Sequence, residues 1–210
     1  MSTSSAPTFG PDDIDIQSVE TVYKGYFRID RYFLRHRRFG GGWTEVFSRE
    51  LFERGHAAAL LPYDPALDRV ALIEQFRIGA HSAGHAAWQL EIVAGIIEDG
   101  ETPENVAVRE TREEAGCAVE DMVRIGDILM TPGGSSESIQ IYCGRVDCSD
   151  LGGFHGLEGE NEDIRAFTIA AEDAFALVRD GRIANAAAVI ALQWLQLNRD
   201  SLRQRWLGAA

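Results

Sequence analysis

The sequence has no long apolar run, few cysteines and few basic side chains relative to acidic ones. No segment approaches the roughly 18 apolar residues that a membrane-spanning helix needs, so no membrane is expected as a partner. The N-terminal residues do not combine a basic region with an apolar stretch, so we expect no secretory signal. Cys117, Cys143 and Cys148 form neither a Cys-x-x-Cys pair nor an even disulfide framework. This pattern predicts a reducing, cytoplasmic setting.

The formal net charge of −13 and a pI near 4.8 indicate an acidic surface. Such a surface argues against general binding of nucleic acid or of an anionic membrane. It leaves room for a small phosphorylated substrate, because a metal ion and a few arginines can invert the field inside a cleft. A chain of 210 residues is long enough for one domain with a full core and a small extension.

Hydrophobic periodicity divides the chain into a polar tail (residues 1–14), a small antiparallel β-domain (15–55) and a larger α/β domain (56–210). In the larger domain, strands are followed by late helices, which predicts a sandwich with a mixed sheet. The expected strands are residues 56–64, 69–77, 88–96, 123–134 and 137–146. Residues 152–164 read as a polar, glycine-rich loop, and residues 170–181 and 185–207 as helices.

The segment from Gly95 to Cys117 is the most informative part of the chain. Thr102 can cap a helix, and proline at position 103 is tolerated as the first helical residue. Gly116 is a plausible end for the same helix. Helical spacing then predicts one core-facing side with three residues, Val108, Thr111 and Ala115.

Three carboxylates, Glu110, Glu113 and Glu114, are expected to share another face of this helix, above Val106 and Ala107. Neighbouring carboxylates repel each other, so such a cluster makes sense around a hard divalent cation such as Mg²⁺, which prefers oxygen ligands. Glutamates on helices are more often solvated surface residues, and only the spacing of the whole segment favours the metal.

That spacing, Gly-x5-Glu-x7-Arg-Glu-x-x-Glu-Glu-x-Gly, resembles the signature of the Nudix hydrolases at every polar and glycine position. It departs at Thr111 and Cys117, where the family usually has aliphatic residues, and both are packing positions. The resemblance implies a Nudix-type α/β/α sandwich with a mixed sheet. It also implies metal-dependent hydrolysis of a pyrophosphate bond.

The resemblance assigns roles to residues in and next to the segment. Glu110 and Glu114 would be the main ligands of Mg²⁺, with Mn²⁺ as an alternative ion. Glu113 would bind the metal directly or through water, and Ala94 would bind it through its backbone carbonyl. Arg109 would hold the glutamates by ion pairing without touching the substrate.

Outside the segment, the chain resembles the branch of this family that cleaves ADP-ribose. Pro132 lies about sixteen residues beyond Gly116, and the similarity extends over roughly residues 15–206. The resemblance implies hydrolysis of ADP-ribose to AMP and ribose 5-phosphate. It further implies a homodimer in which the N-terminal β-domain reaches the partner subunit.

The same resemblance implies a substrate site shared between two subunits. Tyr26 and Arg49 of the partner, Arg77, Glu137 and the backbone at Gly95 would bind the substrate. The residues themselves leave open simpler roles. Tyr26 reads as part of an aromatic strand and can equally serve packing, while an arginine such as Arg77 at a strand end is usually solvated.

Glu160, in the acidic loop after residue 152, would be the general base. Most acids in such loops only increase solubility, and Glu160 is favoured because the chemistry requires a base outside the helix. Glu162 is a near neighbour that the sequence does not separate from it.

Two alternatives follow from the same residues. Another nucleoside-diphosphate sugar, such as GDP-mannose, could be the substrate, because pocket shape decides that choice. A nucleotide sensor that does not cleave its ligand is the other. Such domains typically lose the signature glutamates and carry a DNA-binding extension, whereas this sequence retains Glu110, Glu113 and Glu114.

Overall fold

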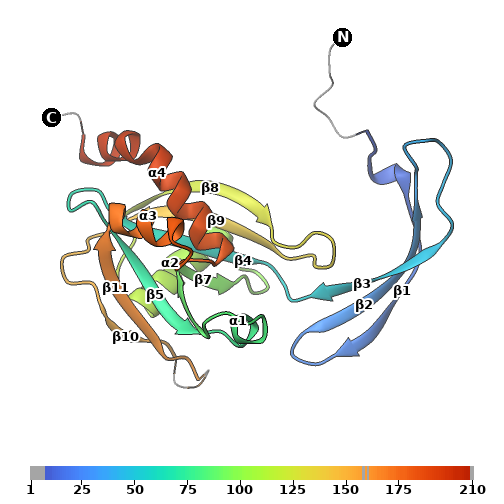
Figure 1. Cartoon of the computed structure of the whole chain (residues 1–210), viewed down its shortest axis with the longest axis horizontal. Coiled ribbons are helices and arrows are strands. Elements are labelled where there is room, and N and C mark those ends of the chain that lie inside the picture. Colours follow the sequence, from blue (N-terminus) through green and yellow to red (C-terminus); the bar gives the residue numbers. More distant parts are fainter. Residues whose placement is uncertain (1–7, 158, 160, 209–210) are drawn as a thin grey trace, which may run out of the picture. The chain divides into compact units, whose positions relative to one another are not determined.

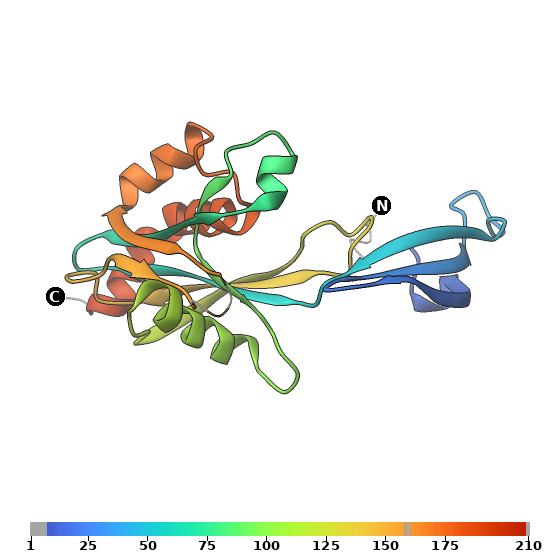
Figure 2. The same ribbon diagram turned by 90° about the horizontal axis from the view of Figure 1, so that it is seen from below.

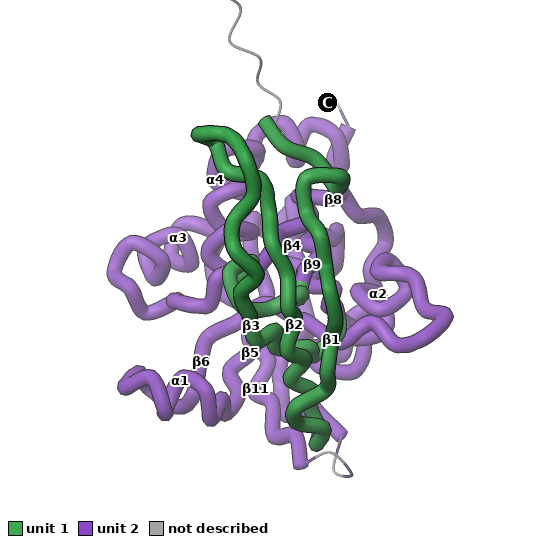
Figure 3. The backbone as a smooth tube through the Cα atoms, turned by 90° about the vertical axis from the view of Figure 1, so that its right-hand side faces the viewer, with its two compact units in different colours: residues 1–55, 131–137 green, residues 56–130, 138–210 purple. Residues whose placement is uncertain are grey.

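The computed structural model describes residues 8–157, 159 and 161–208. The chain divides into two compact units, coloured separately in Figure 3. Unit 1 comprises residues 1–55 and 131–137, and unit 2 comprises residues 56–130 and 138–210. No helix in the described part of the chain has the length and apolar character needed to cross a membrane.

Unit 1 is a three-stranded antiparallel sheet in the order β1-β2-β3. The loop of residues 131–137 packs on β3, where the Phe52 N–H donates to the Gly134 carbonyl (2.8 Å) and the Ser135 hydroxyl donates to the Phe52 carbonyl (3.0 Å). The unit's elements are η1 (Pro11–Asp13), β1 (Ile14–Lys24), β2 (Arg28–His36) and β3 (Phe47–Glu53).

Unit 2 is built on an eight-stranded mixed sheet, in which β10-β11-β5-β4-β9-β8 form the main order. β4 runs parallel to β9, and the remaining pairs are antiparallel. The strands are β4 (Ala57–Asp64), β5 (Arg69–Phe76), β6 (Trp88–Glu91), β7 (Val93–Ile96), β8 (Asp121–Leu129), β9 (Ser138–Arg145), β10 (Gly153–His155) and β11 (Ile164–Ala170).

Helices cover both faces of this sheet (Figures 1 and 2). α3 (Ala171–Arg179) and α4 (Ala186–Leu207) lie on one face, and α2 (Pro103–Ala115) lies on the other. The alternation of β4 explains this arrangement, because successive side chains of a strand point to opposite faces. Leu61 packs in the cluster with α3 and α4, whereas Leu60 packs with α2. The predicted α/β/α sandwich with a mixed sheet is confirmed.

One strand expected from the sequence, residues 88–96, is two strands. β6 pairs with β5, and after the buried residue Ile92 the chain crosses to pair with β4 as β7. This is possible because β4 and β5 pair directly only at Tyr63 and Asp64 and then diverge. The chain therefore passes from β6 to β7 at the point where β4 and β5 separate, and the candidate site lies there.

Two smaller elements also differ from the prediction. The loop expected over residues 152–164 contains β10, which pairs with β11. A short helix, α1 (Ile78–Ser82), follows β5. Both are short and depend on neighbouring elements, so local periodicity does not reveal them.

Candidate active site

The helix α2 has the ends that its sequence predicts. The Thr102 side chain accepts a hydrogen bond from the Asn105 N–H (3.3 Å), and Pro103 is the first helical residue. Gly116 ends the helix with a φ of 67°, a left-handed conformation that favours glycine. A Cβ atom at Gly116 would also lie 2.7 Å from Cε1 of His155, so the His155 ring would have to shift to admit a side chain there.

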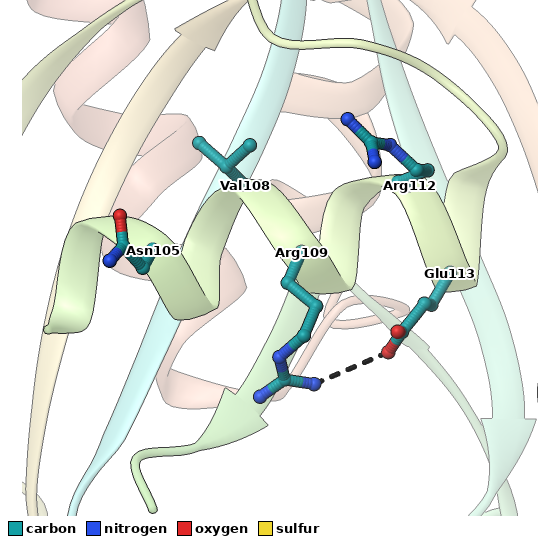
Figure 4. Close-up of a pocket in the computed structure, with 5 residues that line it drawn as sticks. All are labelled: Asn105, Val108, Arg109, Arg112 and Glu113. Atoms are coloured by element: carbon teal, nitrogen blue, oxygen red, sulfur yellow. Dashed lines mark hydrogen bonds and ion pairs between the residues drawn. The ribbon is translucent and has the colours of Figure 1, made fainter. Parts of the chain in front are cut away.

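The prediction that Thr111 and Ala115 face the core is confirmed, whereas the prediction for Val108 is wrong. Val108 is only half-buried, and it lines a pocket of about 300 Å³ on the outer side of the helix (Figure 4). The other lining residues are Asn105, Arg109, Arg112 and Glu113. The buried residues of the helix are Val106, Ala107, Thr111, Glu114 and Ala115.

Glu114 is therefore a carboxylic acid in the middle of a core-facing stripe, with only 3% of its surface exposed. One of its oxygens accepts a hydrogen bond from the Ala94 N–H (3.1 Å). The pKa of Glu114 is raised to about 8, mainly by burial and also by the nearby charges of Glu110 and Glu162, while the Ala94 hydrogen bond opposes this shift. A buried carboxylate with this pKa is typical of a site that receives a cation.

Glu110 lies against the backbone of β7, and this contact explains why the signature begins with glycine. A Cβ atom at Gly95 would overlap the carboxyl group of Glu110 and lie 2.5 Å from its Cγ atom. Burial raises the pKa of Glu110, and the carboxylates of Glu113 and Glu162 act in the same direction, whereas Arg109 opposes them. Glu110 and Glu114 thus form an acidic pair between α2 and β7.

Arg109 binds three carboxylates of the signature. Its guanidinium contacts Glu110 (2.7 Å) and Glu113 (3.2 Å), and Figure 4 shows it turned toward Glu113. On its other side it donates twice to Glu101, from Nε (3.1 Å) and from Nη2 (3.2 Å). The hydrogen bond from Arg109 lowers the pKa of Glu101, which helps to keep that carboxylate charged.

The donor set fits a hard divalent cation, although the side chains are arranged around Arg109. Among the described residues, no three carboxylate, imidazole or thiol groups stand in a metal-binding arrangement. Glu110 and Glu113 instead bind Arg109. The pKa values of Glu110 and Glu114 are raised, and a nearby positive charge would lower them by favouring the charged carboxylates. All available donors are oxygens, as Mg²⁺ prefers.

Arg77 follows the last residue of β5 and directly precedes α1. Its guanidinium pairs with the buried carboxylate of Glu91 (2.9 Å). Burial by itself would lower the pKa of Arg77, but the charges of Glu91, Glu114 and Glu162 raise it. Arg77, Glu114 and Glu162 are therefore within electrostatic reach of one another.

The loop after β10 contains both candidates for the general base. Glu160 lies outside the described residues. Glu162 is half-buried, and its side chain accepts a hydrogen bond from the Leu157 N–H (3.5 Å). The charge of Glu162 raises the pKa of both Glu110 and Glu114, so its carboxylate lies within electrostatic reach of the acidic pair.

The other predicted substrate-binding residues belong to unit 1. Tyr26 lies in the bend between β1 and β2, not in a strand as expected, and is 87% exposed. The Arg49 guanidinium lies 4.5 Å from the centre of the Phe47 ring. Glu137 forms an ion pair with Arg54 (3.2 Å).

Two residues with clear contacts in this site have no role in the sequence analysis. Glu101 anchors Arg109, and its place in the signature spacing was the available signal. Glu91 binds Arg77, and the available signal in the sequence was its place between two apolar residues, Leu90 and Ile92.

Comparison with known proteins shows the family to which the chain belongs. Residues 53–192 match the family model of the NUDIX domain. The chain is 50% identical over 199 residues to the ADP-ribose pyrophosphatase of Escherichia coli (strain K12), with 95% of each chain covered. It is 44% identical over 201 residues to the ADP-ribose pyrophosphatase of Haemophilus influenzae, covering 94% of this chain and 93% of that protein.

More distant relatives share the fold or the family. The chain is 32% identical over 181 residues to the GDP-mannose pyrophosphatase of Pectobacterium atrosepticum, covering 86% of this chain and 92% of that protein. A solved structure of an ADP compounds hydrolase superposes with a TM-score of 0.68 at 23% identity, covering 94% of this chain and 97% of that one. The last likeness concerns the fold alone.

Proposed function

Since the chain belongs to the Nudix family, we propose that it hydrolyses the pyrophosphate bond of ADP-ribose to AMP and ribose 5-phosphate. The buried pair of Glu110 and Glu114 against the backbone of β7 carries the proposal of metal-dependent hydrolysis. The identity of 50% to a pyrophosphatase named for ADP-ribose supports the substrate. Relatives named for GDP-mannose reach only 30–32% identity, so another nucleoside-diphosphate sugar is the second candidate.

The expected cofactor is Mg²⁺, with Mn²⁺ as an alternative. Glu110, Glu114 and the backbone carbonyl of Ala94 would hold it, with Glu113 bound directly or through water. When bound, a divalent ion neutralises charge on the phosphate oxygens and lowers the pKa of water. The raised pKa of Glu110 and Glu114 supports this assignment, because a cation would restore their charged form.

Arginines have two different tasks in this proposal. Arg109, held by Glu101, keeps Glu110 and Glu113 beside the metal position without touching the substrate. Arg77 would contact the phosphates, for which the fixed fork of a guanidinium is well suited.

A base outside α2 would take the proton of the attacking water, and Glu160 and Glu162 are the candidates. We expect Glu160→Gln to lower kcat by about 10²-fold or more while KM changes little, because the base acts in the transition state. Steady-state kinetics with ADP-ribose measures both values. If kcat is unchanged, the same loss is expected from Glu162→Gln, and two active variants would move the base elsewhere.

The N-terminal part of the chain would complete the site across a homodimer. We propose a tail (1–14), a β-domain for dimerisation (15–55) and a hydrolase domain (56–210). Tyr26, Arg49 and Glu137 would bind substrate for the partner subunit, and the backbone at Gly95 would approach it closely.

Subunit mixing tests this sharing. In a homodimer of either variant, every site lacks one residue. Arg49→Ala removes the residue that the partner subunit would contribute, and Glu114→Gln removes the proposed metal ligand. Co-refolded mixtures of the two should regain about one working site in each mixed dimer, because one complete set of residues is restored. A site confined to one chain would give no rescue.

The reaction itself is tested with a panel of substrates, with Mg²⁺ present or chelated. ADP-ribose, GDP-mannose, NADH, diadenosine polyphosphates and deoxynucleoside triphosphates cover the alternatives. Metal-dependent release of AMP from ADP-ribose, well above the rest, is the expected result. Preference for another member would overturn the substrate, and binding without any product would favour a sensor.

The cytoplasmic setting stays a prediction, which the three free cysteines support.

A further inference from the structure

Glu91, the last residue of β6, is a buried carboxylate that three side chains bind. Only 4% of its surface is exposed. It accepts hydrogen bonds from Gln75 (3.3 Å), from Asn185 (3.2 Å) and from Nε and Nη2 of Arg77 (3.2 and 2.9 Å). Burying a carboxylate is costly unless it is paired and hydrogen-bonded, and here both conditions are met.

Gln75 and Asn185 come from different parts of unit 2. Gln75 is on β5, which pairs with β6, and Asn185 precedes α4. The side-chain oxygen of Asn185 accepts from the Ala188 N–H (3.2 Å) and caps α4, which leaves the amide nitrogen to donate to Glu91. The position of the Glu91 carboxylate is therefore set by the sheet and by the start of a helix.

Among the residues that the structure describes, the side-chain partner of Arg77 lies along one edge of its guanidinium. Its backbone N–H donates to the Ala87 carbonyl (2.7 Å), and its Nε–Nη2 edge faces Glu91. The Glu91 side chain is 6% exposed, whereas that of Arg77 is 45% exposed. One edge of the guanidinium is thus bound to a buried carboxylate, while nearly half of the Arg77 side chain is exposed.

We propose that Glu91 is a positioning residue, which holds the guanidinium of Arg77 in the orientation that receives the phosphates of a nucleoside-diphosphate sugar. The inference rests on the proposed function, because it assigns Arg77 to that substrate. An arginine side chain has many rotamers, and a fixed edge removes most of them before the substrate arrives. Binding then orders less of the protein, which strengthens it.

Glu91→Gln tests this role, because it keeps the size of the side chain and removes its charge. With ADP-ribose, we expect KM to rise by about 10-fold while kcat stays within about 3-fold, since a binding contact common to the ground and transition states is weakened. In the Arg77→Ala background, Glu91→Gln should change KM by less than about 2-fold, because residues that act through one another are not additive.

Two further variants serve as controls. Glu74→Gln makes the same chemical change one strand away, where Glu74 pairs with Arg165, and should leave KM unchanged. Asn185→Ser keeps an oxygen to cap α4 and removes the donor to Glu91, so it should raise KM in the same direction as Glu91→Gln. It provides the test if Glu91→Gln does not fold.

The outcomes separate this inference from the function on which it rests. Wild-type protein without activity on ADP-ribose would remove the proposed function, and the inference with it. Active wild-type protein in which Glu91→Gln raises KM equally with and without Arg77 would overturn the positioning role alone. A Glu91→Gln variant with unchanged KM would overturn it as well.

Discussion

Glu114→Gln is expected to abolish turnover and, at the same time, to stabilise the metal-free protein at alkaline pH. Loss of Glu114 as the proposed metal ligand should lower kcat/KM by about 10³-fold, because several kcal/mol of charge stabilisation disappear. The gain in stability follows from burial, since Glu114 is a carboxylate with 3% exposure in a core-facing position. Glutamine fills the same space and carries no charge.

The sign of the pH dependence follows from the pKa of Glu114. Folding raises it from 4.5 to about 8. A carboxyl group whose folded pKa is raised opposes folding as it loses its proton, so the free energy of unfolding falls as pH rises from about 4.5 to 8. The full shift corresponds to at most ~5 kcal/mol, and after local relaxation we expect a difference of about 1–3 kcal/mol between variant and wild type above pH 8.

Thermal unfolding with a chelator, at pH 5 and at pH 8.5, measures this difference. The variant should have the higher Tm at pH 8.5 and nearly the same Tm at pH 5. Glu113→Gln is the matched control on the same helix, because the Glu113 side chain is 35% exposed and should give no such gain. Addition of Mg²⁺ should raise the Tm of the wild type more than that of Glu114→Gln. A Tm of Glu114→Gln that is lowered equally at both pH values would contradict the prediction that the charged form of Glu114 destabilises the metal-free protein.

Gly95→Ala is expected to remove most activity while the protein stays folded. The new methyl group would occupy the space of the Glu110 carboxyl group. The far end of a side chain can move more easily than backbone, so Glu110 should be displaced and the fold retained. Moving a metal ligand by about 1 Å should lower kcat/KM by about 10²-fold, with a loss of about 1–2 kcal/mol in stability from overpacking.

Activity measured against Mg²⁺ concentration distinguishes the cause. A displaced ligand should increase the Mg²⁺ concentration required for half-maximal rate, whereas general misfolding would lower the maximal rate at all concentrations. Gly79→Ala is the control, because a Cβ at Gly79 meets no atom within 4 Å. Wild-type metal dependence in Gly95→Ala would show that Glu110 does not depend on this glycine.

Much of the fold was predictable because local sequence features carry it. Strands β4 and β5 and helices α3 and α4 lie within the residues where apolar periodicity placed them. The break at Ile92 was not predictable, because it depends on where β4 and β5 diverge, which no local pattern of residues 88–96 contains.

The ends of α2, and the carboxylates and arginine that it carries, could be predicted from local residues, because caps and helical spacing are local properties. Which face of α2 is buried depends on tertiary packing. Periodicity favours apolar residues in the core and placed Val108 there, but packing against β7 buried Glu114 instead. Tertiary packing also places Gly95 against Glu110 and brings Glu91 into contact with Arg77 and Asn185. These contacts join residues up to 94 positions apart, and their energies depend on a fold that no short segment specifies.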